Sequence, residues 1–392
     1  MGSEKLHAVL SPSKAHRWLA CPPSARLEEK LNERFGDKSS PFAAEGTKAH
    51  AVAELKLRKE IGVINDFSYN AQRTSLEPIS KQIDWATDVY VDTVMQRFYA
   101  ANKESGDAII RIEDRLDMSP WVPHCFGTGD AVIVSDGYLD VLDYKNGSGV
   151  PVNATGNPQA RLYGLGAINL YGSIYGFQRV RNTIVQPNLD SVTTEELSKD
   201  ELLAWGDSIK PTAELAWRGG GDYNPGEHCQ FCAARALCYH RAIKCMQIFD
   251  SGMPSPGILP DSEIPRILEV ADIAESWIKD IREYARTQAL KGTHWPGFKL
   301  VSGRRPPRKW DNPEAVVDQM SRAGLTDEQI YEPKKLISVS EAEKLLGKPA
   351  FRALLEPMCS QGSGAPTLVP ESDKRPSLNS PDSAFADLAE SE

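Results

Sequence analysis

One stretch of sequence decides the fold: residues 127–145, GTGDAVIVSDGYLDVLDYK. The apolar, β-branched run at 131–134 and the run at 138–143 predict two strands. Ser135-Asp136-Gly137 between them has the composition of a turn. The stretch therefore predicts a β-hairpin with a tight connection.

The second predicted strand ends in charged residues. Its alternation places Leu139, Val141 and Asp143 on one face, with Lys145 next on that face. A carboxylate at the end of an apolar face is costly unless a positive group lies beside it. Asp130 begins the first strand, so two carboxylates and an ammonium can converge at one end of the hairpin. Such oxygen ligands suit Mg²⁺ or Mn²⁺, and an ammonium there can stabilise charge developing on a phosphate.

The pattern on both sides of the hairpin mixes helices and strands. Helices are expected at 14–20, 45–59, 76–102, 157–175, 193–217 and 262–291, strands at 108–116 and 178–185, and a loop at 34–45. This order predicts an α/β fold, with a mixed β-sheet flanked by helices.

Four motifs in this order resemble those of one nuclease superfamily. Asp130 followed by Asp143-Tyr144-Lys145 resembles the D…(D/E)-x-K core of the PD-(D/E)XK nucleases. Gly46-x-x-x-His50 and Gln159-x-x-x-Tyr163 resemble the flanking helical motifs of its RecB/Cas4/AddB-like branch. The resemblance covers about residues 8–245 and implies a restriction-endonuclease-like fold. The sequence departs from the branch in having Asp at 143, where Glu is common, and it contains no G-x-x-x-x-G-K-[ST] motif.

The resemblance also implies a metal site. His50, Asp130 and Asp143 would bind Mg²⁺ or Mn²⁺, and the imidazole shifts the preference toward Mn²⁺. A bound ion lowers the pKa of a water molecule and polarises the scissile phosphate, and Lys145 would position that water. Glu54 shares a helix face with His50, and both metal binding and solvation are open for it.

Two further residues are implied to contact DNA. Gln159 and Tyr163 lie one helical turn apart, and in the family this pair contacts the DNA backbone and frames the metal site. Glu113 precedes the hairpin in a predicted strand. We expect it to be a surface residue, with a place behind the metal ligands as the alternative.

The cysteines suggest a second metal centre. An odd count of seven argues against a disulfide framework. Cys229, Cys232 and Cys238 follow the pattern C-x₂-C-x₅-C, which can share one centre. A [4Fe–4S] cluster takes four cysteines, and the resemblance to iron–sulfur nucleases of the AddB and Cas4 type implies Cys21 as the fourth.

Zinc is one alternative for this centre, and buried cysteines without a metal are another. The same three cysteines with His228 or His240 would form a Cys₃His site. Cys245 is the reserve ligand if Cys21 proves remote.

The chain is predicted to have four parts. They are a nuclease domain closed by the cysteine centre at 1–250, a helical connector at 251–295, a small basic and helical domain at 296–359, and a disordered acidic tail at 360–392. The basic residues Lys299, Arg304, Arg305, Arg308 and Lys309 have aromatic residues nearby. They fit either DNA contact or a solvated linker.

Composition limits the class of protein. No apolar run approaches the ~18 residues of a membrane span, and residues 1–7 lack the pattern of a signal peptide. The net charge of −9 argues against a general nucleic-acid coat protein. We expect a cytoplasmic protein of a bacterial host cell, because the sequence is also similar to a family encoded by phages and prophages.

The function that follows is a metal-dependent deoxyribonuclease, with exonuclease action at DNA ends in phage recombination or replication. DNA is the expected partner, together with a recombinase or single-strand annealing protein. Two alternatives stay open: a non-catalytic DNA-binding or assembly module on a nuclease fold, and a zinc-stabilised adaptor.

Overall fold

The structure is a computed structural model that describes residues 8–35, 41–250 and 261–301 and a few single positions beyond. The chain divides into two units, Met1–Gly257 with Val270–Thr293, and Ile258–Glu269 with His294–Glu392. Most of the helical domain predicted at 296–359 and the tail predicted at 360–392 lie outside the described ranges. The fold described below belongs to the first unit.

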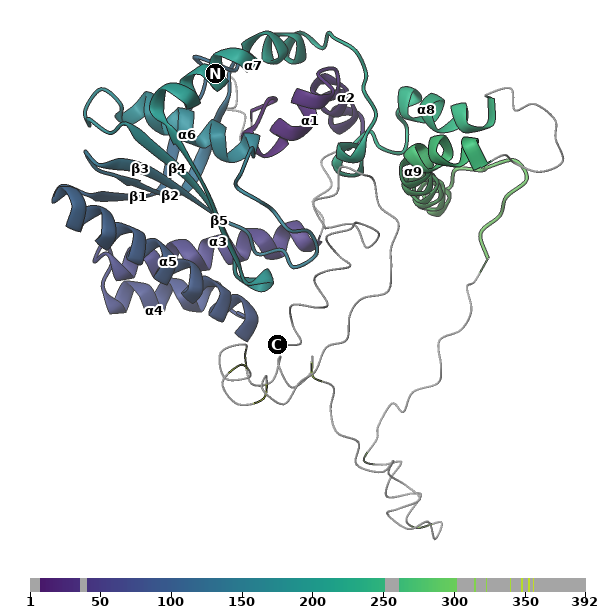
Figure 1. Ribbon diagram of the computed structural model, residues 1–392. Coiled ribbons are helices and arrows are strands. Elements are labelled where there is room, and N and C mark those ends of the chain that lie inside the picture. Colours follow the sequence, from purple (N-terminus) through teal and green to yellow (C-terminus); the bar gives the residue numbers. More distant parts are fainter. Residues whose placement is uncertain are drawn as a thin grey trace, which may run out of the picture. The chain divides into compact units, whose positions relative to one another are not determined.

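The first unit has an α/β fold built on a five-stranded mixed sheet (Figure 1). The strands are β1 (Ile109–Asp117), β2 (Phe126–Val134), β3 (Tyr138–Tyr144), β4 (Arg179–Gln186) and β5 (Ser191–Ser198), in that spatial order. Neighbours are antiparallel except β3 and β4, which are parallel. A parallel pair needs a crossover, which contains the helix α6 (Pro158–Tyr171). The predicted fold class is confirmed.

Helices cover both faces of the sheet (Figure 1). On one face, α3 (Pro41–Glu60) and α5 (Lys81–Ser105) form a hydrophobic core that includes Leu142 and Tyr144 of β3. On the other face, α1 (Ala15–Ala20), α6 and α7 (Lys199–Arg218) form a second core, which includes Leu139 and Val141. The alternation predicted for the second strand of the hairpin is therefore observed.

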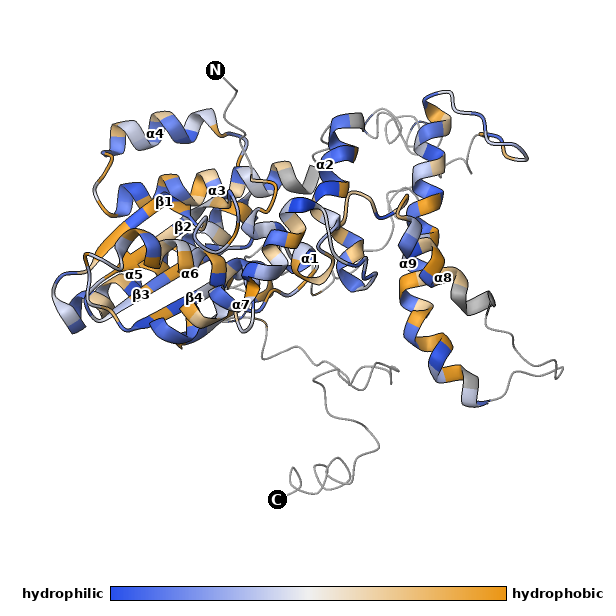
Figure 2. Cartoon of the chain, turned by 90° about the horizontal axis from the view of Figure 1, so that it is seen from above, coloured by the Kyte–Doolittle hydropathy of each residue, from blue (hydrophilic) through white to orange (hydrophobic). Residues whose placement is uncertain are grey.

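The remaining elements lie around these layers. They are η1 (Pro12–Lys14), α2 (Ser24–Phe35), α4 (Asp66–Ser75), η2 (Pro187–Leu189), η3 (Glu227–Phe231), α8 (Tyr239–Asp250), η4 (Asp261–Glu263) and α9 (Ile264–Leu290). The long hydrophilic stretches of α4 in Figure 2 agree with its having no buried residue. Among the described residues, no helix is long and apolar enough to cross a membrane.

The helix predicted at 193–217 was wrong at its start. Ser191–Ser198 forms the edge strand β5, paired with β4, and the helix begins only at Lys199. The β-branched residues Val192, Thr193 and Thr194 favour a strand. Ser198 then starts the helix with a capping box that includes Glu201.

Two predicted element boundaries in the N-terminal part of the chain also need correction. The predicted loop at 34–45 includes the end of α2 and the first residues of α3, which already begins at Pro41. The helix expected from residue 76 begins at Lys81, where Ser80 caps it by accepting a hydrogen bond from the Ile83 amide. The proline at 78 explains the later start, because the residue before proline disfavours helical geometry.

Candidate active site

Asp130 is fixed at the point where the pairing of β2 with β3 ends. That pairing runs from Val134–Leu139 to Ala131–Leu142. Beyond it, the backbone amide of Tyr144 donates to Asp130 Oδ2 at 2.7 Å. The orientation of the carboxylate is therefore set by the neighbouring strand, and its other oxygen faces His50.

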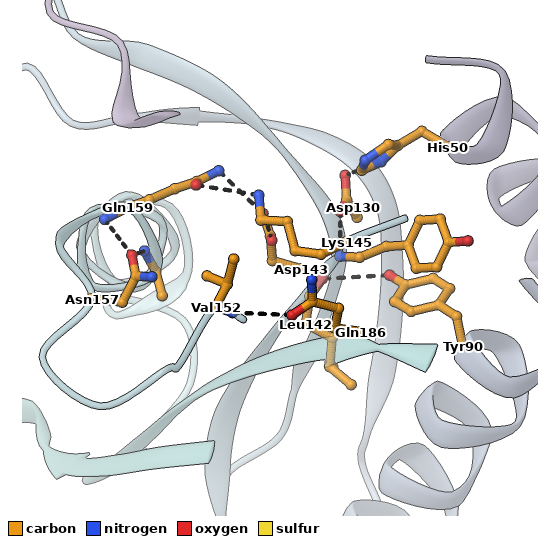
Figure 3. Close-up of polar contacts among 12 residues, drawn as sticks. His50, Tyr90, Asp130, Leu142, Asp143, Lys145, Val152, Asn157, Gln159 and Gln186 are labelled. Carbon is orange, nitrogen blue, oxygen red and sulfur yellow. Dashed lines mark hydrogen bonds and ion pairs between the residues drawn. The ribbon is translucent and has the colours of Figure 1, made fainter. Parts of the chain in front are cut away.

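His50, Glu113 and Asp130 form a trio of potential metal ligands. Their ligand atoms all lie within 4.8 Å of one another, although they come from α3, β1 and β2. His50 Nδ1 lies 3.1 Å from Asp130 Oδ1 (Figure 3). Glu113 has a left-handed backbone, with φ of 52°, which is uncommon for a residue other than glycine and is found preferentially at functional sites.

A second group joins Asp143, Lys145 and Gln159 in a closed ring (Figure 3). Lys145 Nζ lies 2.8 Å from Asp143 Oδ2 and donates to Gln159 Oε1 at 3.2 Å. Gln159 Nε2 in turn donates to Asp143 Oδ1 at 3.2 Å. The ammonium is therefore held between the end of the sheet and the first turn of α6, and Asp143 and Lys145 share a face as predicted.

Burial and neighbouring negative charges raise the pKa values of two carboxyl groups in this site. The pKa of Glu113 is raised to about 7, first by burial and then by the charges of Asp130 and Glu54. The pKa of Asp143 is also raised by burial, with a further contribution from Asp130, although Lys145 opposes the shift. A cation placed among these groups would relieve both effects.

The acids of the site raise the pKa values of its two basic groups. Burial alone would lower the pKa of His50, but its hydrogen bond with Asp130 and the negative charge of that residue raise it. Burial acts in the same direction on Lys145, and the charge of Asp143 outweighs it, so its pKa is raised. The site thus combines an excess of carboxylates with one firmly protonated ammonium.

Tyr163 lies behind this ring, and its side chain is almost fully buried. Burial and the charges of Asp143 and Asp130 raise its pKa well above the usual value, so its hydroxyl keeps its proton. Gly127 leaves space for the aromatic ring of Tyr163, because a Cβ at position 127 would lie 2.8 Å from Tyr163 Cε1. This burial suits the framing role implied for Tyr163 more than broad contact with DNA.

The start of α6 is anchored by residues that the sequence did not single out. The side chain of Asn157 caps the helix and accepts from the amide of Gln159 at 3.0 Å. Glu195 of β5 accepts from the amide of Gly156 at 2.8 Å and from Arg161 Nε and Nη2 at 2.8 and 2.6 Å. The Asn-Pro pair at 157–158 is a helix-start signal, but the contribution of β5 depends on the sheet.

The loop before α6 is held in a similar way by Gln186 of β4. Its Nε2 donates to the carbonyls of Gly147 and Val150. Its Oε1 accepts from the amide of Val152 at 3.0 Å (Figure 3). Because Gln186 is buried, these bonds form in a low-dielectric setting. They tie the segment between Lys145 and Gln159 to the sheet.

The structure changes the interpretation of two acids. Glu113, expected as a surface strand residue, is half-buried and belongs to the trio. Glu54 lies outside the trio and pairs with Arg58 at 2.7 Å. Asp143 was predicted as a ligand, and it pairs with Lys145 instead of belonging to the trio.

The four cysteines predicted for the second centre line one pocket. Cys21 follows α1, Cys229 lies in η3, and Cys232 and Cys238 lie between η3 and α8. All are free thiols. Burial raises the pKa of Cys21, and it raises that of Cys232 to about 12. Such thiols stay protonated until a metal displaces the proton.

The alternatives for this centre are placed differently. His228 also lines the pocket, and its buried Nε2 has no hydrogen-bond partner among the described residues. His240 stacks on Tyr223 with ring centroids 4.0 Å apart. The pocket lining includes Cys21 and, within the part of the chain described, not Cys245.

The predicted basic stretch is only partly described. Lys299 belongs to the second unit and is exposed. Arg304, Arg305, Arg308 and Lys309 lie outside the described residues. DNA binding by this stretch stays a prediction.

Comparison with known proteins identifies the family. A family model described as "Protein of unknown function (DUF2800)" matches residues 7–376. The chain belongs to this family. A solved structure titled "Crystal structure of SSO0001" shares 13% sequence identity over 54% of this chain and 94% of that chain, with a TM-score of 0.21.

Proposed function

We propose that this chain is a metal-dependent deoxyribonuclease that hydrolyses phosphodiester bonds. One observation carries the proposal. The ammonium of Lys145 is held 2.8 Å from Asp143 and 3.2 Å from Gln159, beside a His50–Glu113–Asp130 trio with spacing suited to a metal ion. Residues separated by up to 109 positions (159 − 50) meet near the end of the inner strand β3.

The donor set fits a divalent cation. His50, Glu113 and Asp130 offer one imidazole nitrogen and two carboxylates, a set that suits Mn²⁺ and also Mg²⁺. Asp143 adds a further carboxylate near them. A bound ion would supply a water of lowered pKa and a Lewis acid for the phosphate oxygen.

The chain's own residues have separate tasks in this proposal. Lys145, which keeps its proton, offsets the negative charge that develops on the phosphate. Gln159 fixes the ammonium by accepting one of its hydrogen bonds and donating to Asp143. Asp130 is held by the Tyr144 amide, so it needs little reorganisation to receive the ion.

The test is a cleavage assay on end-labelled linear DNA and closed circular DNA, each single- and double-stranded, with Mn²⁺, Mg²⁺ or EDTA. Lys145→Met keeps the length of the side chain and removes its charge. We expect it to lower kcat by about 10²- to 10³-fold. Lys48→Met on α3, where the ammonium donates to the Pro78 carbonyl, is the matched control. Equal rates for Lys145→Met and wild type, or cleavage that survives EDTA, would contradict the proposal.

We also propose that the cysteine pocket holds a [4Fe–4S] cluster. Four thiols at one pocket match its ligand number. Cys21, Cys229, Cys232 and Cys238 would hold the cluster, each through its thiolate. Iron and acid-labile sulfide in anaerobically purified protein test this, whereas one zinc and no sulfide would support the Cys₃His alternative with His228.

A further inference from the structure

The wall of the cysteine pocket carries positive charge. Arg17, Arg235 and Arg241 line it together with the four thiols. Their acidic partners are Glu28, which pairs with Arg17, and Asp280, which pairs with the other two. Among the described residues, neither acid lines the pocket. The wall therefore presents cations to whatever the pocket contains.

One guanidinium nitrogen of Arg241 has no hydrogen-bond partner among the described residues. Arg241 is 1% exposed. Nη1 donates to Asp280 Oδ2 at 2.6 Å and to the Arg235 carbonyl at 2.9 Å, and Nη2 donates to Ser276 Oγ at 3.1 Å. Nε is buried and has no hydrogen-bond partner among the described residues. A buried N–H without a hydrogen-bond partner is unfavourable, which points to an acceptor inside the pocket.

Arg17, in α1, is held in a similar way. It is 9% exposed, and Nη2 donates to Glu28 Oε2 at 3.4 Å. Its Nε lies 3.3 Å from Glu28 Oε1 but makes no hydrogen bond within the described part of the chain. Two guanidinium groups, each fixed by a carboxylate, thus have an unused Nε–H and line the same pocket.

We propose that Arg17 and Arg241 donate these Nε–H groups to the metal–thiolate centre and thereby raise its reduction potential. The inference rests on the iron–sulfur cluster proposed above and is independent of nuclease activity. Hydrogen bonds to the sulfurs and the surrounding charge both set the potential of such a cluster. Reduction adds one electron to an already anionic centre, so nearby cations and donors stabilise the reduced form more than the oxidised form.

The cluster therefore accepts one electron from a one-electron donor more readily than it would in an uncharged pocket. No bond breaks in this step, and the electron resides on the cluster. The centre is then a redox group whose state the pocket controls, in addition to joining Cys21 to the segment at 229–238.

The experiment measures the midpoint potential of the full-length protein by anaerobic titration with dithionite, followed by electron paramagnetic resonance. Arg241→Gln removes the charge and the Nε–H, whereas Arg241→Lys keeps the charge. Arg17→Gln tests the second donor. Arg218→Gln at the end of α7, where the arginine is exposed and pairs with Glu214, is the control for loss of a positive charge elsewhere.

Arg241→Gln is expected to lower the equilibrium constant for reduction at least tenfold, which is about 59 mV for one electron. Arg241→Lys should fall between it and wild type, Arg17→Gln should shift in the same direction, and Arg218→Gln should stay at the wild-type potential. Variants are compared only when their iron and sulfide content is full. If Arg241→Gln does not fold, Arg241→Lys and Arg17→Gln provide the test.

Unchanged potentials in the loaded arginine variants would overturn the inference while leaving the cluster in place. Zinc, or no metal, in the wild-type protein would overturn it together with the cluster proposal. Neither result bears on cleavage of DNA, which is measured separately.

Discussion

Glu113 gives the most direct test of the metal trio. Glu113→Gln keeps the size of the side chain and removes a carboxylate that lies within 4.8 Å of the ligand atoms of His50 and Asp130. We expect Mn²⁺ affinity to fall by about 10- to 100-fold, the loss that even outer-shell partners of a metal cause. Isothermal titration calorimetry with Mn²⁺ measures it.

Glu54→Gln is the matched comparison, because Glu54 is also an acid near the trio but pairs with Arg58. It should change Mn²⁺ affinity less than Glu113→Gln does. If the two variants reverse this order, Glu54 is the ligand and Glu113 is not.

The sequence could predict part of this site and not Glu113. Asp130, Asp143, Lys145 and His50 belong to motifs, and the structure brings them together. Glu113 belongs to no motif, and its place depends on the pairing of β1 with β2 and on a positive φ. Neither property can be predicted from alternation along a single strand.

Asp140 makes stability depend on pH. It is fully buried in β3, and burial raises its pKa to about 6, against the opposing charges of Arg97 and Arg181 and the hydrogen bond from Thr183. The folded state therefore binds a proton more tightly than the unfolded state does. Stability should fall as the pH rises from about 4 to about 6, by up to about 3 kcal/mol.

Asp140→Asn removes this titration and can still accept the hydrogen bond from Thr183 Oγ1. We expect it to be more stable than wild type above about pH 6, with the difference shrinking toward pH 4. Urea unfolding at a series of pH values checks this. A constant difference across that range would exclude Asp140 as the cause.

The edge strand β5 supports the site from a distance. Glu195 ties Gly156 and Arg161 to the sheet, so it holds the first turn of α6 and with it Gln159. Glu195→Ala should lower kcat by about tenfold or more, because small displacements of positioning groups have large effects on rate. Mn²⁺ affinity should stay unchanged, since Glu195 contacts none of the trio.

Glu195→Gln is the conservative counterpart, since its amide oxygen can still accept from the Gly156 amide or from Arg161. Recovery of part of the activity in this variant, measured under saturating DNA, would separate positioning from a general loss of folding. Loss of Mn²⁺ binding in Glu195→Ala would instead indicate that the fold itself is disturbed.

The elements themselves were predictable to different degrees. The hairpin of β2 and β3 and the helix α6 have strong local signals, in the turn at 135–137 and the Asn-Pro pair at 157–158. The helix predicted from residue 193 overlaps β5, because Glu195, Glu196 and Leu197 favour a helix locally. Pairing with β4 overrides that preference, and this pairing cannot be predicted from local sequence.

The cysteine pocket joins distant parts of the first unit, so its loss should be felt throughout that unit. Cys21→Ser should abolish iron binding and lower Tm by about 5 °C or more, because a centre that binds only the folded state contributes to folding. Cys245→Ser should retain iron, since Cys245 was the reserve ligand and does not belong to the described pocket lining. Iron content and thermal unfolding of both variants decide between them.

The division of the chain was harder to predict than its fold class. The first unit includes Val270–Thr293 as well as the residues up to Gly257, whereas the predicted nuclease domain ended at 250. Arg241 pairs with Asp280 at 2.6 Å, a contact between α8 and α9 that neither segment's periodicity reveals. Cys21 could be assigned to the pocket only through family resemblance, because sequence spacing does not indicate which distant residues meet.

The separation of Cys21 from Cys229 also has a consequence for biosynthesis. A ribosome adds 208 residues (229 − 21) between the two cysteines, which takes about 10–40 s at 5–20 residues per second. For most of that interval Trp18, which is buried in the finished core, has no complete α7 to pack against in the nascent chain. The elements from β1 to α7 are synthesised before Cys229, Cys232 and Cys238 leave the ribosome. We therefore expect the proposed metal centre to be inserted late in the maturation of this protein.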